Sequence, residues 1–310
     1  MNDLGKESAR VQTIDEAHAS QRLDNYLFSL LKGVPKSHIH RIVRSGQVRI
    51  NSQRVESSQR LRAGDRVRIP PVRVAAAAPK PLPRKPARLP VLFEDDFIVA
   101  IDKPAGVAAH GGSGISFGVI EQVRLARPQA KFLELVHRLD KGTSGVLLLA
   151  KKRSALIALH EQLTQRKMAK CYCVLVRGEW RKVKEDVSLP LRKYLSKAGE
   201  RKVAVVAQGQ ESRTVFSLHK KLRGFSLLKA ELRTGRTHQI RVQLAHLSFP
   251  VAGDDKYGDF AWNRELARKG LKRMFLHAES VTLKHPSSDD PLTIVSPLPR
   301  ELEEFLASSN

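Results

Sequence analysis

The sequence contains only two cysteines, Cys171 and Cys173, in 310 residues. They stand two positions apart, too close for an easy disulfide, and no group of cysteines and histidines has the spacing of a zinc site. A disulfide-stabilised scaffold and a zinc module are therefore excluded, and a reducing cytoplasm is the expected location. We expect both cysteines to be small core residues of one strand.

Long apolar segments are also missing. No run of 18 apolar residues occurs, so no transmembrane helix is expected, and the polar N-terminus lacks the apolar stretch of a signal peptide. No glycine-rich loop ends in Gly-Lys-Ser/Thr, which excludes a phosphate-binding loop of the ATPase kind. The glycine-rich stretch 110–114 is predicted to be a turn, with contact to a substrate backbone as the lesser alternative.

Acidic residues are scarce relative to basic ones. The chain has 31 Asp and Glu against 55 Lys and Arg, which gives a formal net charge of +24. A surface this positive favours a polyanionic partner, with RNA or DNA ahead of an anionic membrane surface. Hydrophobic residues still make up 41% of the chain, so wholesale disorder is excluded, and the length suggests two domains.

The basic excess is unevenly distributed, and its steps predict the domain organisation. Residues 1–19 carry a net charge of −2 and are expected to form a flexible tail. Residues 20–74 carry +9, the highest density in the chain. Residues 75–90 are rich in proline and contain four bases and no acid, which predicts an extended linker. The remaining +13 is spread over residues 91–310, which form the large second domain.

The segment 20–74 has the pattern of two short helices and a few strands. Apolar residues at helical spacing predict a first helix ending at Gly33 and a second one between Pro35 and Gly46. Alternation of apolar residues with arginine at 48–50 and 67–69 predicts half-buried strands. Arginines spaced along one surface match phosphate oxygens, which favours RNA binding over a merely solvated basic face.

This segment resembles the S4 RNA-binding domain. The resemblance rests on the following residues: Arg22-Leu23-Asp24, Ile42 with Gly46-Gln47-Val48, Asn51, Val55, and Leu61 with Gly64-Asp65-Arg66-Val67. The sequence departs from the family at Ser37-His38, where Ser-Arg is usual. The resemblance implies that basic side chains contact RNA, and the implied set is Arg22, Lys36, Arg41, Arg44 and Arg49.

The densest motif of the large domain lies at 135–150 and presents a single carboxylate. Asp140 stands between Leu139 and Lys141, just before a turn of Gly, Thr and Ser and an apolar strand at 146–150. A lone aspartate on a loop is ordinarily a helix cap or half of a surface ion pair. Here Leu139 can shield the carboxylate from water, while the flanking bases can keep it ionised or contact phosphate.

A strand is predicted at 169–176, with Lys170 and Tyr172 on one face. A tyrosine on a strand is ordinarily core packing, so Tyr172 is either a core residue or part of a site. Further along, two strands are predicted within 91–103, helices at 116–126 and 153–166, and final strands at 274–277 and 281–284.

A helix is predicted after Gly235, with Thr237 as its N-cap and an apolar stripe formed by Ile240, Leu244 and Leu247. Arg241 lies beside this stripe in the first turns, where a cation opposes the helix dipole. We therefore expect a buried anion beside Arg241, and Asp140 is the candidate.

These stretches together resemble the catalytic domain of the pseudouridine synthases that carry a His-Arg-Leu-Asp motif. The resemblance extends over nearly all of 91–310 and rests on HRLDKGTSGVLLLAK from His137, the pair Lys170-x-Tyr172, and TGRTHQIRVQLAHLSFPVAGDDKYG from Thr234. The sequence departs from the family at Lys141-Gly142, where Arg-Asp is more usual. The resemblance implies an α+β fold: a small S4 module, and a large domain whose catalytic cleft crosses a mixed, mainly antiparallel sheet.

The implied reaction is isomerisation of uridine in RNA, which needs neither metal nor cofactor. Asp140 is implied to act either as the nucleophile at the sugar or by removing a sugar proton, and Arg241 to pair with it. Tyr172 is implied to lie against the uracil and to help move the C5 proton. Further substrate contacts are implied for Arg138, Lys170, Arg236 and His238. No second candidate acid is seen, which argues against glycoside hydrolysis.

The implied partner is 23S ribosomal RNA or its precursor, with uridines 955, 2504 and 2580 as targets. The protein is expected to be a cytoplasmic monomer without membrane contact. Two other functions stay open. One is the same reaction on tRNA or on other ribosomal sites, because loop shapes and basic surface decide target choice. The other is a non-catalytic RNA-binding or ribosome-assembly protein built on the S4 module.

Overall fold

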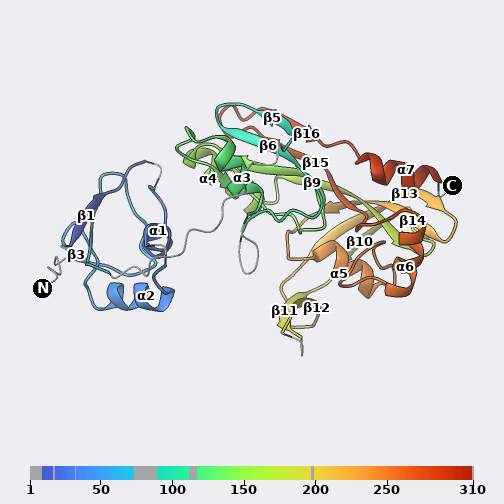
Figure 1. The fold of residues 1–310 in the computed structure, drawn as a ribbon, viewed down its shortest axis with the longest axis horizontal. Helices are drawn as coiled ribbons and strands as arrows, with labels where there is room; N and C mark the ends of the chain where they lie inside the picture. Colours follow the sequence, from blue (N-terminus) through green and yellow to red (C-terminus); the bar gives the residue numbers. More distant parts are fainter. Residues whose placement is uncertain are drawn as a thin grey trace, which may run out of the picture. The chain divides into compact units, whose positions relative to one another are not determined.

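The structure of the chain is a computed structural model that describes residues 9–16, 18–31, 33–72, 89–111, 117–196 and 199–308. Contacts between Cα atoms separate two compact units, Met1–Pro83 and Arg84–Asn310 (Figure 1). The division falls inside the linker predicted at 75–90. Nearly all of this linker lies outside the described residues. Part of the turn predicted at 110–114 also lies outside them. Over the described ranges, no helix is long and apolar enough to cross a membrane.

The N-terminal unit combines two helices with a four-stranded antiparallel sheet of order β1-β4-β2-β3. Its elements are β1 (Arg10–Thr13), α1 (Leu23–Leu30), α2 (Lys36–Arg44), β2 (Arg49–Ile50), β3 (Gln53–Arg54) and β4 (Arg66–Ile69). Both helices and the strands predicted around Val48 and Val67 are present. Apolar side chains from the helices and strands pack into a single core around Leu23, Leu27 and Ile39, which are fully buried.

Part of the segment expected to be a flexible tail is structured. Residues Arg10–Thr13 pair with β4, with Thr13 opposite Arg66, although all four side chains are exposed. Their backbone supplies the hydrogen bonds that β4 would otherwise lack on that edge. A strand held by its backbone alone shows no apolar alternation, so the local sequence did not reveal it.

The larger unit is built on a mixed, mainly antiparallel sheet of ten strands, as the sequence indicated. The main path runs β10-β13-β14-β9-β15-β8-β6-β5, with β16 on β15 and β7 on β8, and the pair of β15 with β8 is parallel. Its strands are β5 (Val91–Glu94), β6 (Ile98–Lys103), β7 (Glu134–Leu135), β8 (Ser144–Ala150), β9 (Ala169–Arg177), β10 (Lys184–Ser188), β13 (Arg213–Leu222), β14 (Phe225–Leu232), β15 (Leu276–Lys284) and β16 (Pro291–Val295). A separate hairpin, β11 (Leu191–Leu195) with β12 (Arg201–Val205), extends away from the sheet (Figure 1).

Helices cover both faces of this sheet. They are α3 (Val119–Ala126), α4 (Arg153–Thr164), α5 (Gln239–His246), α6 (Phe260–Arg268) and α7 (Arg300–Ser308). The alternation along β9 separates the faces: Tyr172 and Val174 belong to the core that α3 and α5 cover, whereas Cys173 packs with α6 and α7. Helix α4 covers β6 and β8 on the second face.

Two sequence predictions about the larger unit need correction. The strands predicted at 274–277 and 281–284 are one strand, β15, whose register shifts between Ala278 and Ser280. This irregularity interrupts the two-residue alternation, and the sequence therefore reads as two strands. The second concerns the cysteines: both lie on β9 and are free thiols, as expected, but only Cys173 is a core residue, whereas Cys171 is half-buried.

Candidate active site

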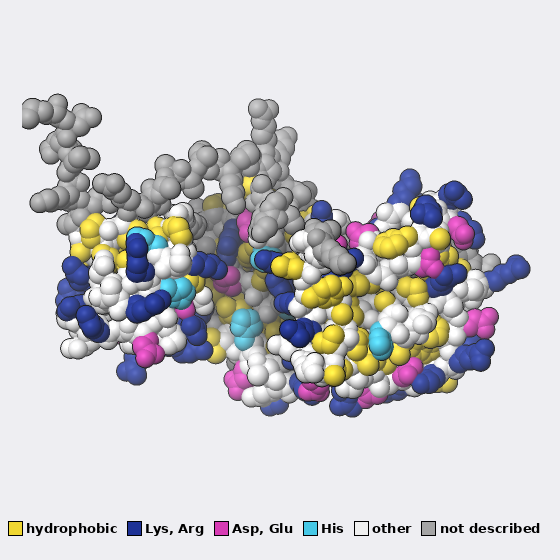
Figure 2. Space-filling view, turned by 90° about the horizontal axis from the view of Figure 1, so that it is seen from below, with side chains coloured by type: hydrophobic (Ala, Val, Ile, Leu, Met, Phe, Trp, Pro, Cys, Tyr) yellow, Lys and Arg dark blue, Asp and Glu magenta, His cyan; other side chains and the backbone are white. Residues whose placement is uncertain are grey.

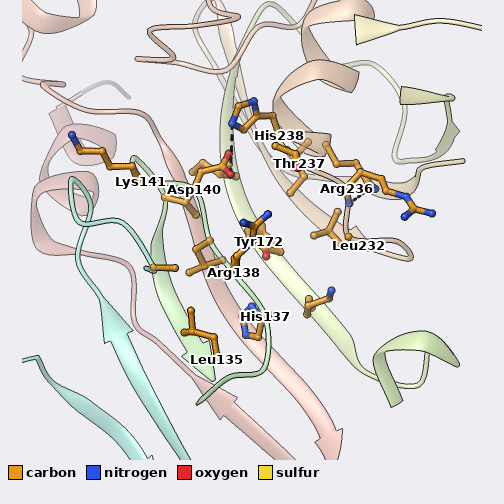
Figure 3. A pocket seen from close by; sticks show the side chains of 18 of the residues that line it. Leu135, His137, Arg138, Asp140, Lys141, Tyr172, Leu232, Arg236, Thr237 and His238 are labelled. Carbon is orange, nitrogen blue, oxygen red and sulfur yellow. Dashed lines mark hydrogen bonds and ion pairs between the residues drawn. The ribbon is translucent and has the colours of Figure 1, made fainter. Parts of the chain in front are cut away.

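A pocket of approximately 960 Å³ opens on the α5 side of the sheet (Figure 3). Three segments form most of its wall: the loop before β8, the first half of β9, and the turn that leads into α5. The pocket gathers all seven side chains that the sequence placed at the catalytic and substrate-binding site, and these are Arg138, Asp140, Lys170, Tyr172, Arg236, His238 and Arg241. Asp140 and Arg241, which are 101 positions apart in the sequence, thus share one cavity.

The loop that carries Asp140 is firmly anchored. Leu139 is buried at its base, and the carbonyl of Asp140 accepts a hydrogen bond from the peptide nitrogen of Thr143 at 3.1 Å. Gly145 then enters β8 with φ of 110°, where a Cβ atom would lie 2.1 Å from the carbonyl oxygen of Ala278 on β15. Only glycine fits this contact. The close approach of β15 and β8 therefore fixes the loop and leaves the carboxylate of Asp140 partly exposed to the pocket.

Asp140 and Arg241 form the ion pair that the sequence indicated. The Nη1 atom of Arg241 donates to Oδ2 of Asp140 at 3.1 Å. The guanidinium is 7% exposed, whereas the carboxylate is 23% exposed. The buried cation thus holds one carboxylate oxygen and leaves the other directed into the cavity.

A second carboxylate, Asp254, binds the same guanidinium and was not assigned a role from the sequence. Its two oxygens accept from Nε and Nη2 of Arg241, both at 2.7 Å, and it is fully buried. The peptide nitrogens of Lys256 and Tyr257 also donate to it. Burial raises the pKa of Asp254, but Arg241 and these peptide donors outweigh it, so the net pKa is lowered. Arg241 therefore lies between the carboxylates of Asp140 and Asp254. It makes two hydrogen bonds of 2.7 Å to Asp254 and one of 3.1 Å to Asp140, so the pair with Asp254 has the better geometry.

The phenol of Tyr172 lies in the pocket and is 6% exposed. Burial and the negative charge of Asp140 both raise the pKa of this phenol, so it is protonated at neutral pH. Its ring continues the apolar surface formed on the same strand face by Val174 and Val176. The two alternatives drawn from the sequence thus coincide, because Tyr172 belongs to the core and also lines the cavity.

The start of helix α5 differs from the sequence prediction. The residue before the helix is His238, not Thr237, and it adopts the left-handed conformation with φ of 55°. The backbone turns there because the side chain of Gln239 caps the preceding turn, accepting from the peptide nitrogen of Arg236 at 3.0 Å. This left-handed turn directs the imidazole of His238 into the pocket, where Nε2 lies 3.9 Å from Oδ1 of Asp140 (Figure 3).

Helix α5 is anchored through buried polar groups rather than through an apolar stripe alone. The hydroxyl of Thr214 on β13 accepts from Gln239 at 2.8 Å and donates to Gln243 at 2.6 Å. Gln243 in turn donates to the hydroxyl of Ser212 at 3.0 Å. Such a satisfied network holds the helix in one position, and with it Arg241 and His238.

A buried lysine supports the loop from below and was also not recognised in the sequence. Lys103, at the end of β6, is fully buried, and its Nζ donates to the carbonyl oxygens of Pro104, Val107 and Lys141 at 2.9, 2.7 and 3.3 Å. The peptide nitrogen of Gly106 donates to that same Lys141 carbonyl at 2.8 Å. Burial lowers the pKa of Lys103 to about 7, with the nearby Arg273 acting in the same sense and Asp140 opposing.

The polar wall of the pocket is basic. Burial lowers the pKa of Lys170, and burial together with Lys170 lowers the pKa of His137 to about 3, so this imidazole is neutral. Its Nε2 accepts a hydrogen bond from the peptide nitrogen of Leu148 at 3.3 Å. Arg138 and Arg236 lie exposed at the rim, and the Nε of Arg236 donates to the carbonyl of Glu211.

A second, shallower groove of about 400 Å³ continues from this rim along the β11–β12 hairpin. It shares Arg138 and Arg236 with the pocket and adds Arg192 and Lys193 from β11, which were not singled out in the sequence. Arg201 of β12 reaches the main pocket. Among the residues that the structure describes, the pocket wall holds one carboxylate, a phenol and no second acid. A basic groove that leads to such a pocket suits a polyanionic substrate that inserts one residue.

Comparisons with known proteins agree with this site. The model of a family described as "RNA pseudouridylate synthase" matches residues 97–246, and that of the S4 domain matches residues 21–67. A curated protein of Pasteurella multocida, "Ribosomal large subunit pseudouridine synthase C", is 47% identical over 307 residues, covering 97% of this chain and 94% of that protein. The chain belongs to the RNA pseudouridylate synthase family.

Other relatives agree with this assignment. The Escherichia coli K12 protein of the same name is 48% identical to this synthase over 306 residues, with 96% of both chains covered. Among solved structures, "Human RNA Pseudouridylate Synthase Domain Containing 4" is 25% identical, with a TM-score of 0.57 over 70% of this chain and 92% of that one. "Human RNA Pseudouridylate Synthase Domain Containing 1", at 23% identity and TM-score 0.58, covers 70% of this chain and 86% of its own length and shares the fold. The synthase is therefore an isomerase that acts on RNA.

The S4 residues of this synthase lie on one basic unit, and all five are exposed. Lys36, Arg41, Arg44 and Arg49 are all exposed, and Lys36 lies over the ring of Phe28 at 5.0 Å. Arg22 pairs with the buried carboxylate of Asp24: its Nε and Nη2 donate to the two carboxylate oxygens at 3.1 and 2.7 Å, which ties two of its nitrogens to the protein. At the position that departs from the family, Nδ1 of His38 lies 2.9 Å from the guanidinium of Arg41.

Proposed function

We propose that this synthase converts uridines of large-subunit ribosomal RNA into pseudouridine, with Asp140 as the group that acts on the ribose. The observation that carries the proposal is the carboxylate of Asp140, open to the pocket and bound through only one oxygen by Arg241. Two curated relatives, 47–48% identical over nearly the whole chain, bear names that specify the ribosomal large subunit. The target uridines we propose are 955, 2504 and 2580 of 23S ribosomal RNA.

The chemistry begins with extrusion of the uridine from its stack into the pocket. Asp140 then attacks C1′ or removes a proton from the sugar, and both routes use the carboxylate that pairs with Arg241. The glycosidic bond breaks, the uracil turns within the pocket, and C5 bonds to C1′. Every atom of the substrate is retained, so the step requires no external oxidant, reductant or energy source, and we propose that no cofactor takes part.

Tyr172 and Arg138 have supporting roles in this proposal. The neutral phenol of Tyr172 lies against the uracil and relays a proton after the new bond forms: it gives up its own proton as it takes the one from C5, so that the net transfer is from C5 to N1 of the turned ring. Arg138, at the rim, fills the space that the extruded base leaves. Lys170, on the same strand face as Tyr172, contacts the polar edge of the base, while Arg236 and the groove residues Arg192 and Lys193 bind flanking phosphates.

The S4 unit supplies affinity through phosphate contacts in this proposal. Figure 2 displays Lys and Arg side chains over the visible face of the N-terminal unit, at the left. The contacting residues we propose are Arg22, Lys36, Arg41, Arg44 and Arg49. Such contacts bind without reading sequence, so the pocket and groove select the uridine. We further propose that the protein works in the cytoplasm as a monomer.

The test is a map of pseudouridines in cells that lack this protein. We expect the targets to be unmodified, and to be restored by the wild-type gene but not by one encoding Asp140→Asn. Retention of pseudouridine at all three ribosomal sites, with losses in tRNA instead, would move the target to tRNA. A map that does not change at all would favour a non-catalytic S4 protein. A map restored by Asp140→Asn would overturn the role of Asp140 and leave the protein itself required for the modification.

A further inference from the structure

His238 occupies a position that the reaction steps above leave unexplained. Its left-handed backbone, with φ of 55°, aims the ring at the pocket instead of along the helix. A non-glycine residue in this conformation is uncommon and is kept where the surroundings require it. The surroundings here are Tyr257, whose hydroxyl lies 2.8 Å from Nδ1 of His238, and Asp140, whose Oδ1 lies 3.9 Å from Nε2.

The hydrogen bonds around Tyr257 assign the tautomer of His238. The peptide nitrogen of Val203 on β12 donates to the Tyr257 hydroxyl oxygen at 2.9 Å. Burial raises the pKa of Tyr257 to about 12, so its hydroxyl keeps the proton and donates it to the remaining neighbour, Nδ1 of His238. With Nδ1 as an acceptor, the hydrogen of a neutral imidazole must sit on Nε2, facing Asp140.

The imidazole is neutral at physiological pH. Burial is the largest influence and lowers the pKa of His238, and the positive charges of Arg241 and Lys256 lower it further. The carboxylates of Asp140 and Asp254 act in the opposite sense but do not reverse the shift. Nε2 is therefore a neutral donor that faces an ionised acceptor.

The separation of that donor and acceptor is informative. Nε2 of His238 and Oδ1 of Asp140 lie 3.9 Å apart, which is too far for a direct hydrogen bond. The gap is also too narrow for another side chain to lie between the two atoms. One oxygen at about 2.8 Å from each atom fits this gap, with the two bonds close to a right angle. That oxygen must accept a hydrogen bond from His238 and donate one to Asp140, which describes a hydroxyl group.

We propose that the 2′-hydroxyl of the target ribose occupies this gap, and that His238 is the residue by which the site selects ribose over deoxyribose. The inference rests on the proposed role of Asp140 at C1′. The 2′-hydroxyl is carried by the carbon next to C1′, and inside an RNA chain the 3′ and 5′ oxygens are esterified. The uracil carbonyls only accept hydrogen bonds, so they cannot satisfy Asp140. The 2′-hydroxyl, a donor and an acceptor, is the one substrate group that matches both atoms.

The experiment measures single-turnover rates on two stem-loop RNAs. One carries the target uridine with ribose and the other carries it with 2′-deoxyribose, so the two RNAs differ only in the 2′ oxygen. We expect wild-type enzyme to act about 10- to 100-fold more slowly on the deoxy RNA, as for loss of a hydrogen bond to a charged group. His238→Asn suits the left-handed backbone but is too short to reach the gap. For this variant we expect the ribose reaction to slow and the ratio between the two RNAs to fall about three- to tenfold, because the 2′-hydroxyl loses its neutral donor while its hydrogen bond to Asp140 remains.

Tyr257→Phe provides a second, independent test of the role proposed for His238. It removes the donor that assigns the tautomer and should also reduce the ratio, so the inference stays open to test if His238→Asn does not fold. His246→Asn, on the exposed end of the same helix, is the matched control and should leave the ratio unchanged. Melting temperatures of all variants separate folding from selectivity.

The outcomes distinguish this inference from the proposed function. An unchanged ratio in His238→Asn or in Tyr257→Phe, or a wild-type enzyme that handles both RNAs equally, overturns the assignment of His238 and leaves the role of Asp140 intact. Activity of Asp140→Asn on the ribose RNA overturns the role of Asp140 itself. A merely structural role for His238 would slow both RNAs by the same factor and keep the ratio.

Discussion

The arginines of the two units illustrate two different uses of one side chain. In the N-terminal unit, Arg41, Arg44 and Arg49 are exposed, where a guanidinium can meet phosphate and can be lost at little cost in folding free energy. In the catalytic unit, Arg241 is 7% exposed and held between Asp140 and Asp254. Removing it leaves a fully buried carboxylate without its partner. We therefore expect net charge to set the affinity for RNA in the N-terminal unit, and the arrangement of buried charge to set the chemistry in the catalytic unit.

The sharpest test of this comparison is Asp140→Asn. The amide is almost the same size but can neither attack the sugar nor remove a proton at neutral pH, so we expect turnover to fall by about a thousandfold or more. RNA affinity should stay within a few-fold, because the phosphate contacts are unchanged. Asp255→Asn is the control: its carboxylate also lies near Arg241, at 3.5 Å, but is 96% exposed, and its activity should stay near wild type. Near wild-type turnover by Asp140→Asn would refute the catalytic role.

Arg241→Met should weaken the fold as well as the reaction. Losing one partner of a buried ion pair costs about 3–5 kcal/mol, and here the orphaned group is Asp254. The free energy of unfolding, measured with urea, should fall by that amount. Arg264→Met, on the exposed surface of α6, should change it by less than about 0.5 kcal/mol. Equal effects of the two substitutions would mean that burial does not distinguish these arginines.

Deleting residues 1–88 tests the other half of the comparison. The S4 segment and the linker carry +9 and +4, and all of the proposed catalytic groups lie beyond residue 90. The fragment should bind its natural RNA about tenfold or more weakly, with a smaller dependence of binding on salt, because fewer counterions are released. It should still act on a short RNA at high concentration. An unchanged salt dependence would show that the S4 unit does not contact phosphate, and an insoluble fragment would place the domain boundary elsewhere.

Lys103 predicts a pH dependence of stability in the alkaline range. Burial lowers the pKa of its ammonium to about 7 in the folded state, whereas the unfolded chain keeps the ordinary value near 10.5. Between these pH values the unfolded state binds more protons, so stability rises with pH, by up to about 1.4 kcal/mol per pH unit. Below pH 7 both states are protonated and the slope disappears. The measurement is the difference in unfolding free energy between wild type and Lys103→Met from pH 6 to 10, which cancels other titrations. A flat difference would contradict the buried, destabilised ammonium.

Local sequence patterns were sufficient for most elements and for the core of the site. Alternation along β9 placed Tyr172 and Lys170 on one face, and the position of Arg241 against the helix dipole called for an anion that Asp140 supplies at 3.1 Å. The same reasoning missed β1, whose side chains are exposed, and assigned the wrong residue to the start of α5. The first error arises because β1 is held by backbone pairing with the distant strand β4. The second arises because the side chain of Gln239 caps the turn before α5 and moves the start of the helix by one residue.

By itself, the sequence determined the α+β class, the uneven distribution of charge between the two units, and the single carboxylate around which the site is built. Tertiary structure alone decided the surroundings of that carboxylate: Asp254 on the far side of Arg241, Lys103 under the loop, and the imidazole of His238 turned toward Oδ1 by Tyr257. Periodicity and motif spacing report on neighbours within a few turns of chain. The hydrogen bonds that orient a charged group join residues that meet only in the folded domain, so local sequence patterns do not reveal their geometry.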